Sequence, residues 1–201
     1  MSYQNPSETN RPVQTCSRVS DSHEWFRDVY LQTYADLVRF VVRRIHPPDR
    51  AEDVVAEAFV IAWQRLGDLP QELDEARAWL FGITRRLLLA EYRAQSRGQS
   101  LSVRIAENST TTTAHDDLVA TSVDLIRAWQ KLAAVHQEAL SLRVWEGLSA
   151  QQAAGVLSIS PVAFRIRLSR ARRALKVHLR SLPEPVDRSA NPFPVKEGRL
   201  S

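Results

Sequence analysis

The sequence predicts an all-α protein made of two small helical domains joined by a flexible linker. Along most of the chain, apolar residues recur at steps of three, four or seven, and no stretch of useful length alternates with the period of two that marks a half-buried strand. Proline-containing and Ser/Thr-rich segments interrupt this pattern at both ends and in the middle. The 201 residues, 44% hydrophobic and 25% charged, suffice for one mid-sized core or two small ones.

The interruptions set the domain boundaries. Prolines gather near both ends, so segments 1–22 and 182–201 are predicted to be disordered tails. The Ser/Thr-rich stretch 98–117 is the predicted linker, between a first domain over 23–97 and a second over 118–181. Twenty extended residues reach about 66–72 Å. We therefore expect the linker to keep the two domains apart.

The first domain is predicted to be a three-helix bundle. Its helices are expected over about 23–45, from Asp49 as N-cap to about residue 66, and over about 74–97. Helical spacing places the following residues on the inward faces of these helices: Phe26, Tyr30, Leu37, Val41 and Ile45; Val55, Phe59, Ala62 and Leu66; Trp79, Ile83, Leu87 and Leu88.

The second domain is predicted to end in a helix-turn-helix. Helices over about 118–134 and 136–146 precede a short helix over 150–157, a three-residue turn and a long helix over 161–180. Ser149 and Ser160 are suited to N-cap the last two helices. The expected inward residues are Leu125, Ile126, Trp129 and Leu132, then Ala139, Leu140, Leu142 and Trp145, and finally Phe164, Leu168, Ala171 and Leu175.

The distribution of charge points to nucleic acid. The formal net charge is only +4, but 24 of the 27 basic residues are arginine, and segment 161–180 carries seven basic residues and no acidic one. A solvated basic face is the alternative, but like charges on one helix repel each other unless an anion compensates them. We expect duplex DNA here. The residues expected to contact base edges are Ser160, Ala163, Arg165, Arg167 and Arg170. Those expected to contact phosphates are Arg172, Arg173 and Lys176.

The second and third helices carry opposite charges. The second places Asp53 and Glu57 on one face, with Trp63 beyond, which suits a basic protein partner; acids that stabilise the helix dipole are the alternative. The third carries arginines interleaved with an aromatic residue, which can follow a nucleic-acid backbone and stack on unpaired bases. Its residues are Arg77, Arg85, Arg86, Tyr92, Arg93 and Arg97.

Four stretches together resemble the extracytoplasmic-function (ECF, group 4) sigma factors of the bacterial sigma-70 family. RAEDVVAEAFVIAW at 50–63 is similar to the polymerase-binding helix of that family, and RAWLFGITRR at 77–86 with EYR at 91–93 is similar to its −10 element segment. EGLS at 146–149 and RLSRAR at 167–172 are similar to its −35 helix-turn-helix. The resemblance spans about residues 25–181.

The resemblance implies a sigma factor that directs RNA polymerase core to promoters and assists their opening. Glu52, Asp53, Glu57 and Trp63 would bind the clamp helices of the core. Loop 67–73 and the arginines of the third helix would hold the melted non-template strand of the −10 element. Duplex DNA of the −35 element would contact the second domain, which also touches the polymerase flap, through Ser160, Val162, Ala163, Arg165, Ile166, Arg167, Arg170, Arg172 and Arg173. Whether an anti-sigma factor binds the chain stays open.

Several positions depart from the family pattern. Ala56 stands where a polar residue is usual, and Ser158 stands in the turn where glycine is common because it accepts positive φ. Val162 and Ile166 replace small or polar residues of the recognition helix. Promoter preference therefore cannot be transferred from relatives.

Other functional classes explain less of the sequence. A helix-turn-helix regulator that acts without being a polymerase subunit accounts for the basic helix but not for the acidic second helix. Five dispersed histidines and the lack of a nucleophile constellation or phosphate loop predict no enzyme, catalytic residue, metal or cofactor. A single cysteine, a polar N-terminus and no long apolar run predict a cytoplasmic protein that binds no membrane.

Overall fold

The computed structural model describes residues 13–45, 47–95, 103 and 116–181. Within these ranges the chain forms α-helices, two short 3₁₀ helices and loops, and no strand, which confirms the all-α prediction. None of the described helices is long and apolar enough to span a membrane. The elements are α1 (Val13–Val42), η1 (Pro48–Arg50), α2 (Ala51–Gln64), η2 (Leu66–Asp68), α3 (Leu73–Gln95), α4 (Asp116–Gln130), α5 (Ala134–Val144), α6 (Ala150–Leu157) and α7 (Pro161–Arg180).

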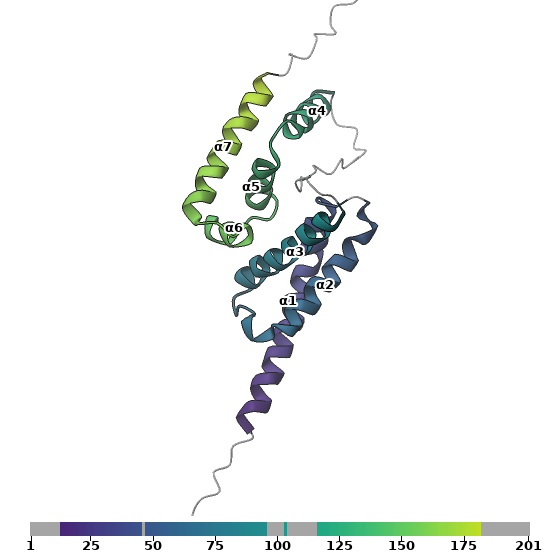
Figure 1. Ribbon diagram of the computed structural model, residues 1–201, viewed down its shortest axis with the longest axis vertical. Coiled ribbons are helices and arrows are strands. Elements are labelled where there is room, and N and C mark those ends of the chain that lie inside the picture. The colour runs from purple at the N-terminus through teal and green to yellow at the C-terminus, as the bar shows by residue number, and fades with distance from the viewer. Residues whose placement is uncertain (1–12, 46, 96–102, 104–115, 182–201) are drawn as a thin grey trace, which may run out of the picture.

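Helices α1, α2 and α3 pack together as the N-terminal bundle (Figure 1). Helix α1 begins at Val13, so residues 13–22, predicted as tail, are helical, and the start of α1 extends beyond the bundle. Asp49 is not the N-cap of the second helix. A 3₁₀ turn begins at Pro48, so Asp49 is already helical, and Arg50 caps α2 without a side-chain hydrogen bond.

The core of the N-terminal bundle follows part of the predicted pattern. Leu37, Val41, Val55, Phe59 and Ala62 are buried as expected, whereas Tyr30 is 38% exposed. Helix α3 is buried on more than one side, because it packs against α1 and α2 and also against α6. Its buried residues are Ala76, Ala78, Leu80, Phe81, Gly82, Ile83, Thr84 and Leu88.

Helices α4 to α7 form the C-terminal bundle, and the helix-turn-helix prediction is confirmed. Helix α7 has the predicted bounds and buries Phe164, Leu168 and Ala171. The Ser149 hydroxyl accepts from the Gln152 amide at 3.2 Å, and the Gln152 side chain accepts from the Ser149 amide at 3.0 Å, which completes a capping box. Leu125 was expected inward and is 41% exposed.

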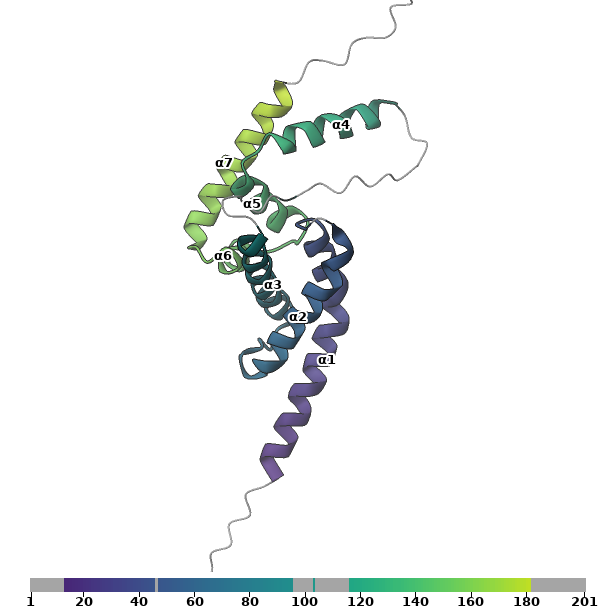
Figure 2. The ribbon, with the colours of Figure 1, turned by 45° about the vertical axis from the view of Figure 1, so that its right-hand side comes forward.

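The two bundles are not kept apart. Helix α6 packs against α3 (Figure 2), and Gly82 of α3 faces the Val156 backbone of α6. Val103, from the predicted linker, is buried: its amide donates to Gln137 Oε1 at 3.1 Å, and its carbonyl accepts from Trp129 Nε1 at 2.7 Å. The rest of the predicted linker up to residue 115, and the tail segments 1–12 and 182–201, lie outside the described residues.

The turn of the helix-turn-helix offers a stability test. Ser158 ends α6 with φ 55°, in the left-handed region where a Cβ atom is unfavourable. Ser158→Gly should raise the free energy of unfolding by about 0.5–1 kcal/mol after the greater freedom of glycine in the unfolded chain is counted. Denaturant unfolding measures this change. Ser158→Ala keeps the Cβ atom and should give no gain, and a loss of stability with glycine would contradict the argument.

Candidate protein-binding and nucleic-acid interfaces

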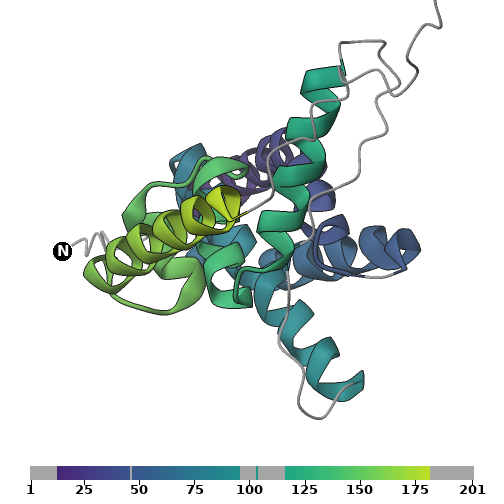
Figure 3. The same cartoon turned by 90° about the horizontal axis from the view of Figure 1, so that it is seen from above.

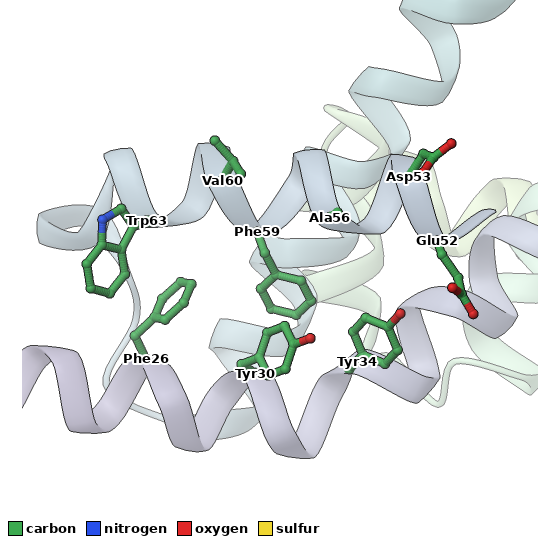
Figure 4. A pocket seen from close by; sticks show the side chains of 9 residues that line it. All are labelled: Phe26, Tyr30, Tyr34, Glu52, Asp53, Ala56, Phe59, Val60 and Trp63. Atoms are coloured by element: carbon green, nitrogen blue, oxygen red, sulfur yellow. The ribbon is translucent and has the colours of Figure 1, made fainter. Parts of the chain in front are cut away.

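An aromatic groove runs between α1 and α2. Figure 4 shows α1 side chains projecting toward α2, with Phe59 directed back at the tyrosines. Apolar rings form most of the groove, and two carboxylates lie at one end. Its lining residues, which we call the aromatic groove, are Phe26, Tyr30, Tyr34, Glu52, Asp53, Ala56, Phe59, Val60 and Trp63.

Ring contacts fix the shape of this groove. The Phe26 and Trp63 rings meet edge to face with centroids 5.0 Å apart, and the Tyr30 and Phe59 centroids are 4.7 Å apart. His23 also packs against Trp63, with ring centroids 4.7 Å apart. Trp63 is nevertheless 46% exposed. A large aromatic surface is therefore held in place while it remains open to solvent.

The acidic end of the groove affects one tyrosine. Desolvation, the Glu52 carboxylate and neighbouring Tyr30 all raise the pKa of the Tyr34 hydroxyl above its ordinary value. The hydroxyl therefore stays a neutral hydrogen-bond donor beside the acids. A partner with basic and apolar side chains would match both ends of the groove.

The structure brings together three of the four residues predicted for a protein partner. Glu52, Asp53 and Trp63 line the groove, whereas Glu57 is exposed on α2 but does not line it. Sequence reasoning assigned Phe26 and Tyr30 to the core and did not single out Tyr34. The available signal was the spacing: three aromatic residues four positions apart form one stripe along α1.

The arginines of α3 do not share one exposed face. Arg86 and Arg93 are exposed, while Arg77, Arg85 and Tyr92 are half-buried. Arg77 donates to Asp36 Oδ2 at 2.5 Å and to the Glu146 carbonyl at 2.7 Å, and Arg85 Nε lies 3.5 Å from Glu138 Oε1. Arg97 lies outside the described residues.

These contacts belong to a charge cluster that joins the two bundles, and we call it the inter-bundle cluster. It consists of Arg43, Arg44, Arg77 and Arg85 from the N-terminal bundle and Glu138 and Glu146 from the C-terminal bundle. Glu146 accepts from Arg43 at 2.8 and 2.9 Å. Sequence reasoning did not identify the contacts of Arg43 with Glu146 and of Arg44 with Glu138, because these partners lie 103 and 94 residues apart.

Arg44 lies at the centre of this cluster. Its side chain is fully buried, its guanidinium donates to the Phe40 carbonyl and to Ser141 Oγ, each at 2.8 Å, and it sits 3.5 Å from the centroid of the Phe40 ring. Burial lowers the pKa of Arg44, while the carboxylates of Glu138 and Glu146 act against this change. The Nε atoms of Arg43, Arg44 and Arg85 make no hydrogen bond with a described residue. The cluster is therefore only partly satisfied.

The outer face of α7 is basic and unpaired. Helix α7 lies on the side of the C-terminal bundle away from α1 and α2 (Figure 3). None of its basic side chains forms an ion pair with a described residue. Of the predicted contact residues, Arg167 is half-buried; the exposed ones are Ser160, Val162, Ala163, Arg165, Ile166, Arg170, Arg172 and Arg173. No cluster of metal-ligating side chains occurs among the residues that the structure describes.

Comparison with known proteins decides the family. Residues 29–98 match the family model of sigma-70 region 2, and residues 122–175 match that of sigma-70 region 4. The ECF RNA polymerase sigma factor SigL of Mycobacterium tuberculosis is 30% identical over 159 residues, which cover 78% of this chain and 89% of SigL. The chain is an ECF sigma factor of the sigma-70 family. The sigma factor YlaC of Bacillus subtilis is 28% identical, covering 76% of this chain and 90% of YlaC.

Solved structures share the fold of this sigma factor. The sigma factor RpoE of Bartonella quintana, solved with the anti-sigma factor NepR, matches with a TM-score of 0.58 and 23% identity, covering 79% of this chain and 98% of that one. CnrH, solved with the cytosolic domain of CnrY, matches with a TM-score of 0.53 and 24% identity, covering 84% and 96%. The match to region 2 covers residues 29–98. The alternative function, a stand-alone helix-turn-helix regulator, does not explain this part of the chain.

The inter-bundle cluster generates a prediction about shape. Glu138→Gln combined with Glu146→Gln leaves the buried Arg44 guanidinium without a carboxylate, and removing one partner of a buried pair costs about 3–5 kcal/mol. The two bundles should therefore separate. Small-angle X-ray scattering of the full chain should show a larger radius of gyration for the double variant. Glu72→Gln removes an exposed acid outside the cluster and serves as the control. Unchanged scattering from the double variant would contradict this role.

Proposed function

We propose that this sigma factor binds the RNA polymerase core through the aromatic groove of region 2 and promoter DNA through α3 and α7. This assignment rests on one observation: the two regions of the chain present surfaces of different chemistry. An open aromatic groove with an acidic end lies in region 2, and region 4 presents a basic helix face whose side chains form no ion pair with the described part of the chain. We assign the chain no catalytic role.

The groove suits the clamp helices of the polymerase core. Exposed aromatic side chains supply most of the energy at protein interfaces, and Trp63 with Tyr30 offers such surface at a fixed geometry. Asp53 and Glu52 add complementary charge for basic groups of the partner. We add Phe26, Tyr30 and Tyr34 to the interface that the sequence predicted.

Arginines and Tyr92 of α3 are assigned to the melted −10 element. Arg86 and Arg93 are exposed and can meet a strand at once, whereas Arg77 and Arg85 are engaged by the C-terminal bundle. Binding a strand along the whole of α3 requires that Glu138 and Glu146 withdraw. The bundles would therefore move apart when the chain binds the core and the promoter.

The outer face of α7 is assigned to the duplex −35 element. A recognition helix places the side chains of its N-terminal half against base edges, which here are those of Arg165 and Arg170 with Ser160 and Ala163. Arg172 and Arg173, farther along α7, are assigned to phosphates.

An anti-sigma factor is the remaining partner. Two structural neighbours were solved in complexes: RpoE with a protein named as an anti-sigma factor, and CnrH with the cytosolic domain of CnrY. Their fold is that of this chain, which supports a partner of the same kind that holds the chain away from the polymerase.

Transcription in vitro tests the proposed function. The purified full chain and core polymerase are incubated with a pool of promoter sequences, and the transcripts are sequenced. We expect enrichment of templates that share an upstream and a downstream element. Equal footprints on duplex DNA with and without core polymerase, and no transcript that depends on the chain, would favour a regulator that is not a polymerase subunit.

The position of two acids relative to the groove predicts different effects on core binding. Asp53→Lys places a positive charge in the groove and should abolish co-purification with the core. Glu57→Lys makes the same change on the same helix outside the groove and should weaken binding far less. Both residues are exposed, so both variants should stay folded; Asp53→Lys should lower the thermal unfolding midpoint slightly, because a cation in the first turn of α2 opposes the helix dipole. An equal loss of core binding in both variants would contradict the placement of the interface.

The assignments on α7 predict a split between specificity and general affinity. Arg165→Ala or Arg170→Ala should cost about 1–3 kcal/mol of discrimination between the preferred and altered upstream elements. Arg173→Ala, a matched exposed arginine, should weaken all sequences equally and lower the salt dependence of binding. Quantitative binding of holoenzyme to both templates measures these effects. A uniform loss with Arg165→Ala would reassign that residue to phosphate.

A further inference from the structure

An apolar pair occupies the outermost line of the basic face of α7. Val162 is 58% exposed and Ile166 is 49% exposed, and they lie four residues apart, one turn of the helix. They stand two positions before and two positions after the fully buried Phe164, and two positions rotate a side chain by about 200° around the helix. Both therefore point directly away from the core of the C-terminal bundle.

Charged residues surround this pair on both sides. The exposed Arg165 and Arg170 lie on opposite flanks of the line that Val162 and Ile166 follow, and α7 carries no acidic residue. The complementary ligand is therefore a polyanion that also offers apolar groups at its centre. In the major groove of duplex DNA, the phosphates lie on both sides, and the apolar group is the 5-methyl group of thymine.

We propose that Val162 and Ile166 determine promoter specificity by contacting thymine methyl groups in the −35 element. This inference rests on the proposed function of α7 and names the bases that it reads. Four residues span about 6 Å along a helix, which corresponds to about two base-pair steps of 3.4 Å. The element therefore contains two thymines, on either strand, within about two steps of each other. The flanking arginines read the neighbouring bases.

Removal of a single methyl group tests the proposal without altering base pairing. The upstream element is first selected from a randomised pool with holoenzyme made from the full chain. Each selected thymine is then replaced by deoxyuracil, which lacks only the 5-methyl group. For each methyl group that the pair contacts, wild-type holoenzyme should bind the deoxyuracil template about fourfold more weakly than the thymine template. This factor corresponds to the free energy of burying one methylene-sized group.

Variants of α7 assign the effect to the pair. Holoenzyme with Ile166→Ser should bind the thymine and deoxyuracil templates equally at one position, and Val162→Ser should do so at another. Val177→Ser changes a residue of similar exposure, 53%, near the other end of α7, and should keep the full wild-type response. All three side chains are exposed, so thermal unfolding should show that the fold is unchanged.

Three outcomes separate this inference from the proposed function. Equal binding of thymine and deoxyuracil templates at every selected position, or a selected element without thymine, would overturn the inference. The proposed function would still be supported if binding depends on the sequence of the element. A reduction in core binding by Ile166→Ser, with no change in methyl response, would make the pair a protein contact and also overturn it. Failure of the holoenzyme to select any upstream element would contradict the proposed function itself.

Discussion

The arrangement of the two bundles depends on how the Arg44 guanidinium is neutralised. A buried cation is strongly unfavourable unless carboxylates and hydrogen-bond acceptors surround it. Among the described residues, the N-terminal bundle supplies the Phe40 carbonyl and the face of the Phe40 ring, while Glu138, Ser141 and Glu146 come from the C-terminal bundle. Carboxylates therefore neutralise the charge of Arg44 in the docked arrangement of region 4 on region 2, and water has to take their place when the bundles separate.

Such a contact fixes geometry more strongly than it adds stability. Transfer of charges out of water cancels much of the attraction between them, and three guanidinium Nε atoms of the cluster remain without a hydrogen bond. On separation of the bundles, water can solvate these arginines and both glutamates. The docked arrangement can therefore give way to another arrangement, in which a different anion neutralises the same arginines. The phosphates of a single strand are chemically equivalent to the carboxylates in this respect.

Features set by neighbouring residues in the chain could be predicted from the sequence, and features set by distant pairs could not. The bounds of α7, the caps at Ser149 and Ser160 and the strained turn at Ser158 follow from spacing within a few residues. In the inter-bundle cluster, Arg44 meets Glu138 and Glu146, which are 94 and 102 positions away, and no periodicity reports such a pair. The prediction that Tyr30 is buried was wrong for a related reason. The line of apolar and aromatic residues along α1 continues from the core into the open aromatic groove, and periodicity alone does not show where burial ends.

The docked arrangement affects the two DNA-binding surfaces differently. The Glu138 carboxylate lies beside Arg85 of α3 and the Glu146 carbonyl accepts from Arg77, whereas the basic residues of α7 form no ion pair with any described residue. Helix α7 itself lies on the side of the C-terminal bundle away from α1 and α2. A duplex can therefore approach α7 while the bundles are still docked, but a melted strand cannot occupy the whole of α3. The aromatic groove is also open in this state, so core binding at the groove, as proposed, would not require prior separation. If α3 binds the melted strand as proposed, the steps that this geometry restricts are those that involve single-stranded DNA. The inter-bundle cluster would then act on promoter opening rather than on the first encounter with the promoter.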